Sequence, residues 1–228
     1  MIRVGHKGAG HVAPGNTVES FQAALEAGVD MIEFDVLPLD GVLVLAHDRE
    51  EADERTPLTL DQGLDHFAGE AYDDMQLDVD LKLPGYEAEV VEGLRSRGLD
   101  RRALISSHYL ESLAKVGELA PGIRRGWSVP NVRRDYSKNP FLAVPAYGVL
   151  QVMRRRIPGQ AARAIGERRC EALMANRLVV TERLVRAVHD AGGELYVWTV
   201  DDAEQIARLE ELGVDAVITN DPRLFPPA

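Results

Sequence analysis

Apolar stretches of strand length alternate along this chain with segments of helical periodicity. The strand-length stretches cover residues 2–5, 31–37, 42–46, 77–83, 103–106, 194–200 and 216–219. Helical patterns stand between them, among them 18–26 behind a capping Thr17, 181–191, and 202–212 before Gly213. Strands that alternate with helices predict parallel βα units. The repeated order of helix, glycine and strand favours an α/β fold, a single-domain (β/α)8 TIM barrel over residues 1–228, although doubly wound sheets share this pattern.

Composition narrows the class of protein. The 228 residues are 45% hydrophobic, which suits one domain with a sizeable core. A formal net charge of −11 disfavours nucleic acid as a partner, because nucleic-acid affinity depends on neutralising phosphates. The single Cys170 excludes an intrachain disulfide and a cysteine-rich zinc site, and it fits a reducing cytoplasm.

The same sequence argues against secretion and against a membrane anchor. A strand at 2–5 leaves no room for a signal segment before it. The longest nearly apolar stretch, 141–153, is shorter than the ~20 residues that span a bilayer. We therefore expect a cytoplasmic protein without a transmembrane helix.

Charged side chains share one face on each of two predicted strands. Glu33 and Asp35 alternate with apolar residues in one strand, and Asp78, Asp80 and Lys82 do so in another. In a parallel barrel the apolar face packs under the helices, so the charged face points inward, where unpaired carboxylates are costly. We expect Glu33, Asp35 and Asp80 to bind a divalent cation, Mg²⁺ or Ca²⁺, because oxygen ligands favour hard ions. The alternative is a metal-free network in which Lys82 is the counter-ion, but one lysine balances these acids poorly.

Two histidines are candidates for proton transfer. His6 follows the first strand and His47 follows the stretch 42–46, so both are expected at strand carboxyl ends, where barrel active sites lie. Asp48 could orient the site or cap the next turn. Of the other histidines, only His108 follows a predicted strand closely enough to reach the same region.

Positive charge and an aromatic ring are expected at the same mouth. Lys7 and Lys82 would bring positive charge there, which an anionic substrate needs. Trp198 is either a core residue or a wall that stacks against the substrate. In the segment 128–169, the arginines around 154–156 form either a solvated helix face or a contact with an anionic lipid surface, and 150–153 fits a strand or a helix end.

Taken in order, these motifs resemble the glycerophosphodiester phosphodiesterase family, within the phosphatidylinositol phosphodiesterase-like TIM barrel superfamily. The family's motifs correspond to His6-Lys7-Gly8, Pro14-Gly15-Asn16-Thr17, Glu33-Phe34-Asp35, His47-Asp48, Asp80-Leu81-Lys82, Ile105-Ser106-Ser107, Val197-Trp198-Thr199-Val200 and the stretch 213–220. The resemblance covers nearly the whole chain.

The resemblance implies a metal-dependent phosphoric diester hydrolase that converts a glycerophosphodiester and water to glycerol 3-phosphate and an alcohol. It implies that His6 attacks or abstracts a proton and that His47 protonates the leaving alkoxide. Glu33, Asp35 and Asp80 would hold the metal, and Lys82 would bind phosphate. Whether a cyclic phosphate forms on the way stays open.

Four positions depart from the family's pattern. Lys7 stands for an arginine and loses its two-pronged contact with phosphate. Gly15 stands for a glutamate, Asp80 for a glutamate, and His108 for the usual phenylalanine. Two alternatives therefore stay open: a phospholipase D-type enzyme acting on lysophospholipids, with a peripheral lipid contact, and a non-catalytic barrel that binds phosphodiesters.

Overall fold

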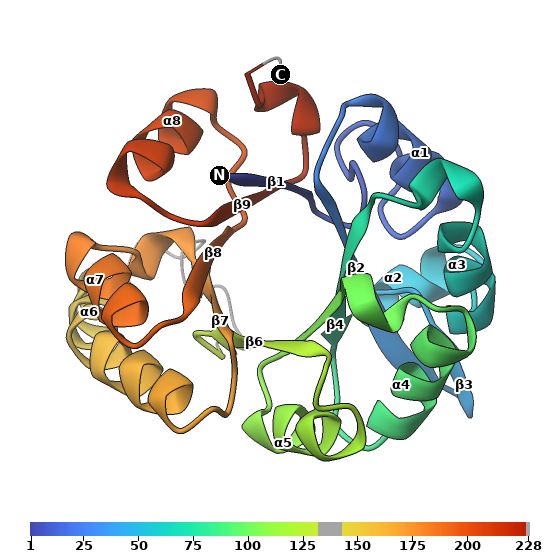
Figure 1. The fold of residues 1–228 in the computed structure, drawn as a ribbon. Helices are drawn as coiled ribbons and strands as arrows, with labels where there is room; N and C mark the ends of the chain where they lie inside the picture. The colour runs from blue at the N-terminus through green and yellow to red at the C-terminus, as the bar shows by residue number, and fades with distance from the viewer. Residues whose placement is uncertain (132–142, 227–228) are drawn as a thin grey trace.

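The computed structural model describes residues 1–131 and 143–226, and for 143–146 only the backbone. Its strands are β1 (Ile2–Gly5), β2 (Met31–Leu39), β3 (Val42–Val44), β4 (Gln76–Leu81), β5 (Ala103–Ser107), β6 (Arg124–Val129), β7 (Ala172–Asn176), β8 (Glu194–Trp198) and β9 (Ala216–Thr219). All of these strands except β3 are parallel neighbours, and β1 pairs with both β2 and β9, so the sheet closes on itself (Figure 1). The predicted (β/α)8 barrel is confirmed.

Helices surround the closed sheet in Figure 1. They are α1 (Val18–Glu26), α2 (Arg49–Glu54), α3 (Leu60–Phe67), α4 (Glu87–Ser96), α5 (Leu110–Leu119), α6 (Ala143–Gly166), α7 (Glu182–Asp190) and α8 (Ala203–Leu212). The predicted cap Thr17 accepts a hydrogen bond from the backbone of Ser20, and Gly213 ends α8 in the left-handed conformation with φ of 86°. None of the helices in the described part of the chain has the length and apolarity needed to cross a membrane.

The stretch 42–46 was wrongly predicted to be a barrel strand. Its strand, β3, pairs antiparallel with the end of β2 and lies outside the ring. The cause is the Asp40-Gly41 turn, in which both residues have positive φ, 48° and 87°. Such an Asp-Gly pair closes a two-residue hairpin, so β2 folds back on itself instead of passing to a helix.

Other predicted bounds also need correction. The strand expected over 77–83 ends at Leu81, the one over 194–200 ends at Trp198, and 150–153 lies inside α6. Strands β6 and β7 were not predicted. Strand β6 was missed because Arg124, Arg125 and Gly126 interrupt its apolar pattern. The strand tolerates the two arginines because Arg124 pairs with Glu194 and Arg125 with Glu171.

The barrel interior is apolar toward the amino-terminal ends of the strands and charged toward their carboxyl-terminal ends. Val4, Met31, Leu104, Tyr196 and Ile218 belong to a buried cluster contributed by β1, β2, β5, β8 and β9. The next inward positions of β2 are Glu33 and Asp35, two and four residues beyond Met31. The apolar layer fills the barrel on the amino-terminal side of the acidic layer. Water therefore reaches the acidic side chains only from the carboxyl-terminal mouth of the barrel.

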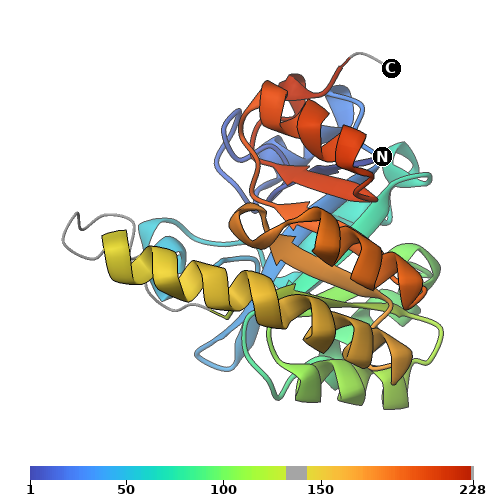
Figure 2. The same ribbon diagram turned by 90° about the vertical axis from the view of Figure 1, so that its left-hand side faces the viewer.

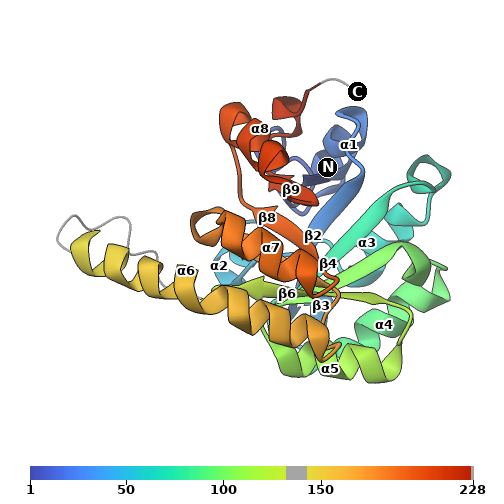
Figure 3. The same ribbon diagram turned by 60° about the vertical axis from the view of Figure 1, so that its left-hand side comes forward.

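Helix α6 is longer than the strands and projects past the barrel on the side of α2 (Figures 2 and 3). Its carboxyl-terminal half is packed against the barrel, where Ile157, Ala161, Ala164 and Ile165 are buried in the core. Its amino-terminal half carries exposed apolar side chains.

Candidate active site

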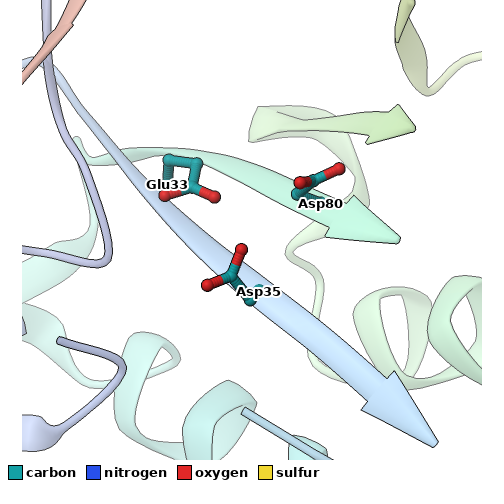
Figure 4. Close-up of side chains that lie close together, drawn as sticks. All are labelled: Glu33, Asp35 and Asp80. Atoms are coloured by element: carbon teal, nitrogen blue, oxygen red, sulfur yellow. The ribbon is translucent and has the colours of Figure 1, made fainter. Parts of the chain in front are cut away.

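Three carboxylates from two neighbouring strands converge inside the barrel (Figure 4). Glu33 and Asp35 come from β2 and Asp80 from β4, and one oxygen of each lies within 4.8 Å of the others. The parallel register places Glu33 beside Asp78 and Asp35 beside Asp80. The predicted sharing of one inward face is confirmed.

Burial and mutual repulsion set the charge state of this cluster. Burial, followed by the charge of Asp35, raises the pKa of Glu33 well above its usual range. Burial also pushes the pKa of Asp35 upward, but the ammonium ions of Lys82 and Lys7 outweigh it and hold that pKa well below its usual range. Burial would lower the pKa of Lys82, yet Asp35 and Asp80 raise it well above normal. Lys82 is therefore a fixed cation beside these acids.

The cluster fits a divalent cation. Oδ1 of Asp80 is buried and has no hydrogen-bond partner among the described residues. Oδ1 of Asp35 forms an ion pair with the Lys82 ammonium ion. Carboxylate oxygens with free lone pairs are the ligands that hard cations prefer, and a bound cation would relieve the mutual repulsion of the three carboxylates.

His6 is oriented by a chain of side chains that sequence patterns did not reveal. Its Nδ1 lies 2.6 Å from Oδ1 of Asn220, whose Nδ2 donates to Asp201 at 2.8 Å. Because the amide nitrogen is used by Asp201, the amide oxygen faces His6 and accepts the Nδ1 hydrogen. The free Nε2 then points toward the acids, 3.9 Å from Glu33. Burial lowers the pKa of His6, which favours the neutral ring.

His47 reaches the site from the loop after β3 and not from a barrel strand. Its Nδ1 lies 2.9 Å from Oδ2 of Asp48, whose other carboxylate oxygen accepts the backbone N–H of Glu51. Asp48 thus both orients His47 and caps α2, the two roles that the sequence left open. The hydrogen bond from Glu51, together with His47, lowers the pKa of Asp48, so this residue is an anion at neutral pH.

One pocket of about 160 Å³ brings most of the predicted site residues together. Its lining includes His6, His47, Glu33, Asp80, Lys82 and Trp198. Asp35 is fully buried next to the pocket. The pocket is therefore the place where both histidines, the acids and a lysine meet.

Lys7 does not line this pocket. Its Nζ donates to Glu51 at 3.0 Å and lies 4.0 Å from Asp35. The lysine stem lies against Gly15, where an added Cβ would come within 2.8 Å of Lys7 Cβ. The departures from the family pattern at positions 7 and 15 are thus linked. The side chain of Lys7 occupies the space that a side chain at position 15 would need.

Trp198 and His108 form one wall of the pocket. Trp198 is half-buried and donates from Nε1 to the carbonyl of Met174 at 2.9 Å. His108 meets its ring edge-on, with centroids 6.2 Å apart, and contacts the carbonyl of Ser128 through Nδ1 at 2.8 Å. The ring of Trp198 packs against the core and also lines the pocket, while its stacking against a substrate stays a prediction.

Glu51, the third residue of α2, was missed by the sequence analysis. Its carboxylate accepts from Lys7 Nζ, from Arg55 at 2.8 Å, from the backbone of His47 at 3.2 Å and from Asn16 at 3.4 Å. Its side chain is only 16% exposed. It therefore ties the loop that carries His47 to the loop that carries Lys7 and His6. No local pattern indicates this role, because charged residues are common in first turns.

Asp78 lies in the same acidic layer and gives a prediction about stability. Burial, and to a smaller degree Asp80, raises the pKa of Asp78 to about 8, although a hydrogen bond with Ser106 opposes this. In the unfolded chain the pKa is about 3.9. The folded state therefore holds a proton that the unfolded state loses, and stability falls as pH rises from about 4 to about 8.

Asp78→Asn should remove this loss. We expect the variant to exceed the wild type in free energy of unfolding by on the order of a few kcal/mol near pH 8, with a smaller difference near pH 5. Urea unfolding in the presence of EDTA measures the free energy of unfolding of both proteins at the two pH values. The exposed Asp73→Asn is the control and should leave the profile unchanged. Equal stability of Asp78→Asn and wild type at both pH values contradicts the assignment.

Comparisons with known proteins identify the family of this chain. The model of the glycerophosphoryl diester phosphodiesterase family matches residues 6–59 and 68–224. The chain is 26% identical to a glycerophosphodiester phosphodiesterase of Caldanaerobacter subterraneus, over 96% of this chain and 93% of that protein. A glycerophosphodiester phosphodiesterase of Arabidopsis thaliana is 29% identical over 96% of this chain and 70% of its own length.

Solved structures show the same fold. A protein from Silicibacter pomeroyi described as a glycerophosphoryl diester phosphodiesterase superimposes with a TM-score of 0.77 at 23% identity, over 98% of this chain and 91% of that one. A phosphodiesterase from Oleispira antarctica, in complex with its product sn-glycerol-3-phosphate, gives a TM-score of 0.73 at 23% identity, over 98% and 94%. Since the family model spans most of the sequence, the chain belongs to the glycerophosphoryl diester phosphodiesterase family.

Proposed function

We propose that this protein hydrolyses glycerophosphodiesters to glycerol 3-phosphate and an alcohol, with a divalent cation as cofactor and residues 1–228 acting as one domain. The observation that carries the proposal is the pocket in which two histidines, the acid cluster and Lys82 meet. The relative from Oleispira antarctica, solved with sn-glycerol-3-phosphate, supports the choice of product. The substrate is a small molecule, and a cytoplasmic location stays a prediction.

His6 is the base or nucleophile in this proposal. Its lowered pKa leaves the ring neutral near pH 7, and the contact with Asn220 keeps the Nε2 lone pair directed into the pocket. His47 lies on the pocket wall with its Nδ1 held by Asp48, so its Nε2 is the atom that gives a proton to the departing alcohol oxygen. Two histidines with separate orienting groups divide the two proton transfers between them.

The remaining residues bind charge and substrate. Glu33, Asp35 and Asp80 would hold Mg²⁺ or Ca²⁺, which supplies positive charge to the phosphoryl oxygens. Lys82 adds a permanent cation at the pocket wall for the same oxygens. Trp198 offers a flat apolar surface for the glycerol portion. Lys7, which does not line the pocket, adds positive charge next to Asp35.

A substrate panel tests this proposal. The purified chain is incubated with several glycerophosphodiesters and with lysophospholipids, each with Mg²⁺, with Ca²⁺ and with EDTA, and glycerol 3-phosphate is measured. We expect release of glycerol 3-phosphate from soluble diesters only when a cation is present. Bound diester that survives long incubation uncleaved would instead support the non-catalytic barrel.

Lysophospholipids are the second candidate substrates because of one observation. Apolar side chains of α6, among them Tyr147, Val149 and Val152, are exposed on the half of the helix that projects past the barrel. Turnover of micellar lysophospholipid without turnover of soluble diesters would favour the phospholipase D-type activity.

Glu51→Gln tests the link between the two histidine loops. The neutral amide keeps the size of the side chain but weakens its contacts with Lys7, Arg55 and the backbone of His47. We expect kcat/KM for diester hydrolysis to fall roughly tenfold to a hundredfold, because small misplacement of catalytic groups has effects of that size. Its exposed neighbour is the matched control: Glu50→Gln should keep full activity. Equal kcat/KM for both variants would refute the positioning role.

A further inference from the structure

The projecting half of α6 presents apolar side chains to solvent. Tyr147, Val149 and Val152 are 64%, 54% and 47% exposed, and Leu178, in the short helix Arg177–Val179 that contacts α6, is 47% exposed. Leu150 and Met153 of the same helix pack against the core. Val149 and Val152 are three residues apart and share one side of the helix, whereas Tyr147 lies on another side. An exposed apolar side of this kind marks a binding face.

Helix α6 is positively charged, whereas the chain as a whole is negatively charged. Helix α6 contains four arginines and no acidic residue, although the whole chain has 37 acidic residues against 26 lysines and arginines. Arg155 and Arg156 follow the apolar stretch directly, are exposed and form no ion pair with any described residue. Arg177 beside Leu178 is exposed and unpaired in the same sense. The apolar face is therefore bordered by free guanidinium groups.

A hollow of about 660 Å³ separates α6 from the end of β6. Trp127, Val129 and Pro130 line one side, and Val149, Val152 and Met153 line the other. Arg156 lies at the same hollow. The strand residue between Trp127 and Val129, Ser128, lines the pocket of the candidate active site. The hollow and that pocket are thus on opposite faces of one strand end.

We propose that the α6 lipid face, defined as Val149, Val152, Arg155 and Arg156, binds an anionic lipid surface. Apolar side chains would enter the acyl boundary while the guanidinium groups contact headgroup phosphates, as in helices that lie at membrane interfaces. Figures 2 and 3 show that this half of α6 projects past the barrel on the side of α2, where no other helix or strand of the described residues surrounds it. The proposal does not depend on catalysis by the pocket.

Two other occupants fit the face less well. A second copy of the chain related by a two-fold axis would bring the same unpaired arginines toward each other, and their repulsion opposes such a contact. Nucleic acid would be attracted by the arginines, but it gains nothing from the exposed valines, because its affinity comes from neutralising phosphates. An anionic lipid surface uses both the apolar groups and the arginines.

Cosedimentation of the full chain with vesicles tests the proposal. One vesicle preparation contains phosphatidylcholine and phosphatidylglycerol, the other phosphatidylcholine alone. We expect binding to the anionic vesicles that is at least about tenfold tighter than to the neutral ones and that weakens as salt is raised. Equal binding to both, or binding to neither, overturns the proposal.

Matched variants separate the face from general charge. Arg155→Glu/Arg156→Glu and Val149→Asp/Val152→Asp should each lose most vesicle binding and keep activity on a soluble diester and a normal thermal unfolding curve. The control Arg95→Glu/Arg101→Glu changes net charge equally on exposed positions elsewhere and should bind vesicles as the wild type does. Equal loss in the control overturns the proposal. So does a dimer seen by light scattering that Val149→Asp/Val152→Asp disrupts while vesicle binding persists, or duplex DNA bound more tightly than the vesicles.

Discussion

His6→Ala should lower kcat for glycerophosphodiester hydrolysis by about 10²-fold to 10⁴-fold, the range expected when a positioned proton-transfer group is removed. The loss follows from the geometry of this ring, whose Nδ1 is fixed by Asn220 and whose Nε2 faces the acids. Steady-state kinetics with a soluble diester measure it.

The matched control is His11→Ala, because His11 is exposed in the same glycine-rich loop. It should keep kcat within about twofold of the wild type, as is usual for an exposed residue without partners in the mechanism. Asn220→Ala should reduce kcat less than His6→Ala does, since it frees the ring without removing it. Full activity of His6→Ala would show that the proton transfer belongs to another group.

Divalent cation should be required for turnover and should also stabilise the fold. EDTA is expected to stop glycerol 3-phosphate release, and added Mg²⁺ or Ca²⁺ to restore it. A cation at about one hundred times its Kd stabilises the folded state by about 2.7 kcal/mol, which corresponds to roughly 5–10 °C in Tm for a domain of this size. Differential scanning calorimetry measures the shift without reference to activity.

Asp80→Asn tests whether the shift comes from the acid cluster. The amide removes one charged ligand, whose buried Oδ1 has no hydrogen-bond partner within residues 1–131 and 143–226. We expect the cation-induced rise in Tm to vanish, whereas the exposed Asp74→Asn should retain it. A rise in Tm of unchanged size in Asp80→Asn would place the cation elsewhere, and turnover in EDTA would contradict the cofactor proposal.

The acidic part of the site could be predicted because its signal is local. Alternation along a strand has a period of two residues, so Glu33 and Asp35 had to share a face, and a parallel register then brings Asp80 beside Asp35. The barrel followed from the alternation of strands and helices. Even so, β6 escaped prediction because its arginines are held by Glu171 and Glu194, partners that a local pattern does not reveal.

The orienting residues could not be predicted for the same reason. His6 and Asn220 are 214 positions apart in the sequence and meet only when β1 and β9 close the barrel. Glu51 gains its role from the Asp40-Gly41 hairpin, which directs α2 toward the mouth. His47 was placed correctly at the mouth, but from the wrong element, since β3 does not belong to the ring.

Phosphorus NMR of a glycerophosphodiester incubated with the purified chain tests the central proposal most directly. With Mg²⁺ or Ca²⁺ the diester signal should be replaced by that of glycerol 3-phosphate in equal amount, with none of this change in EDTA or with His6→Ala. An unchanged diester signal in the presence of either cation, or conversion to a phosphate ester of the other alcohol, would contradict it.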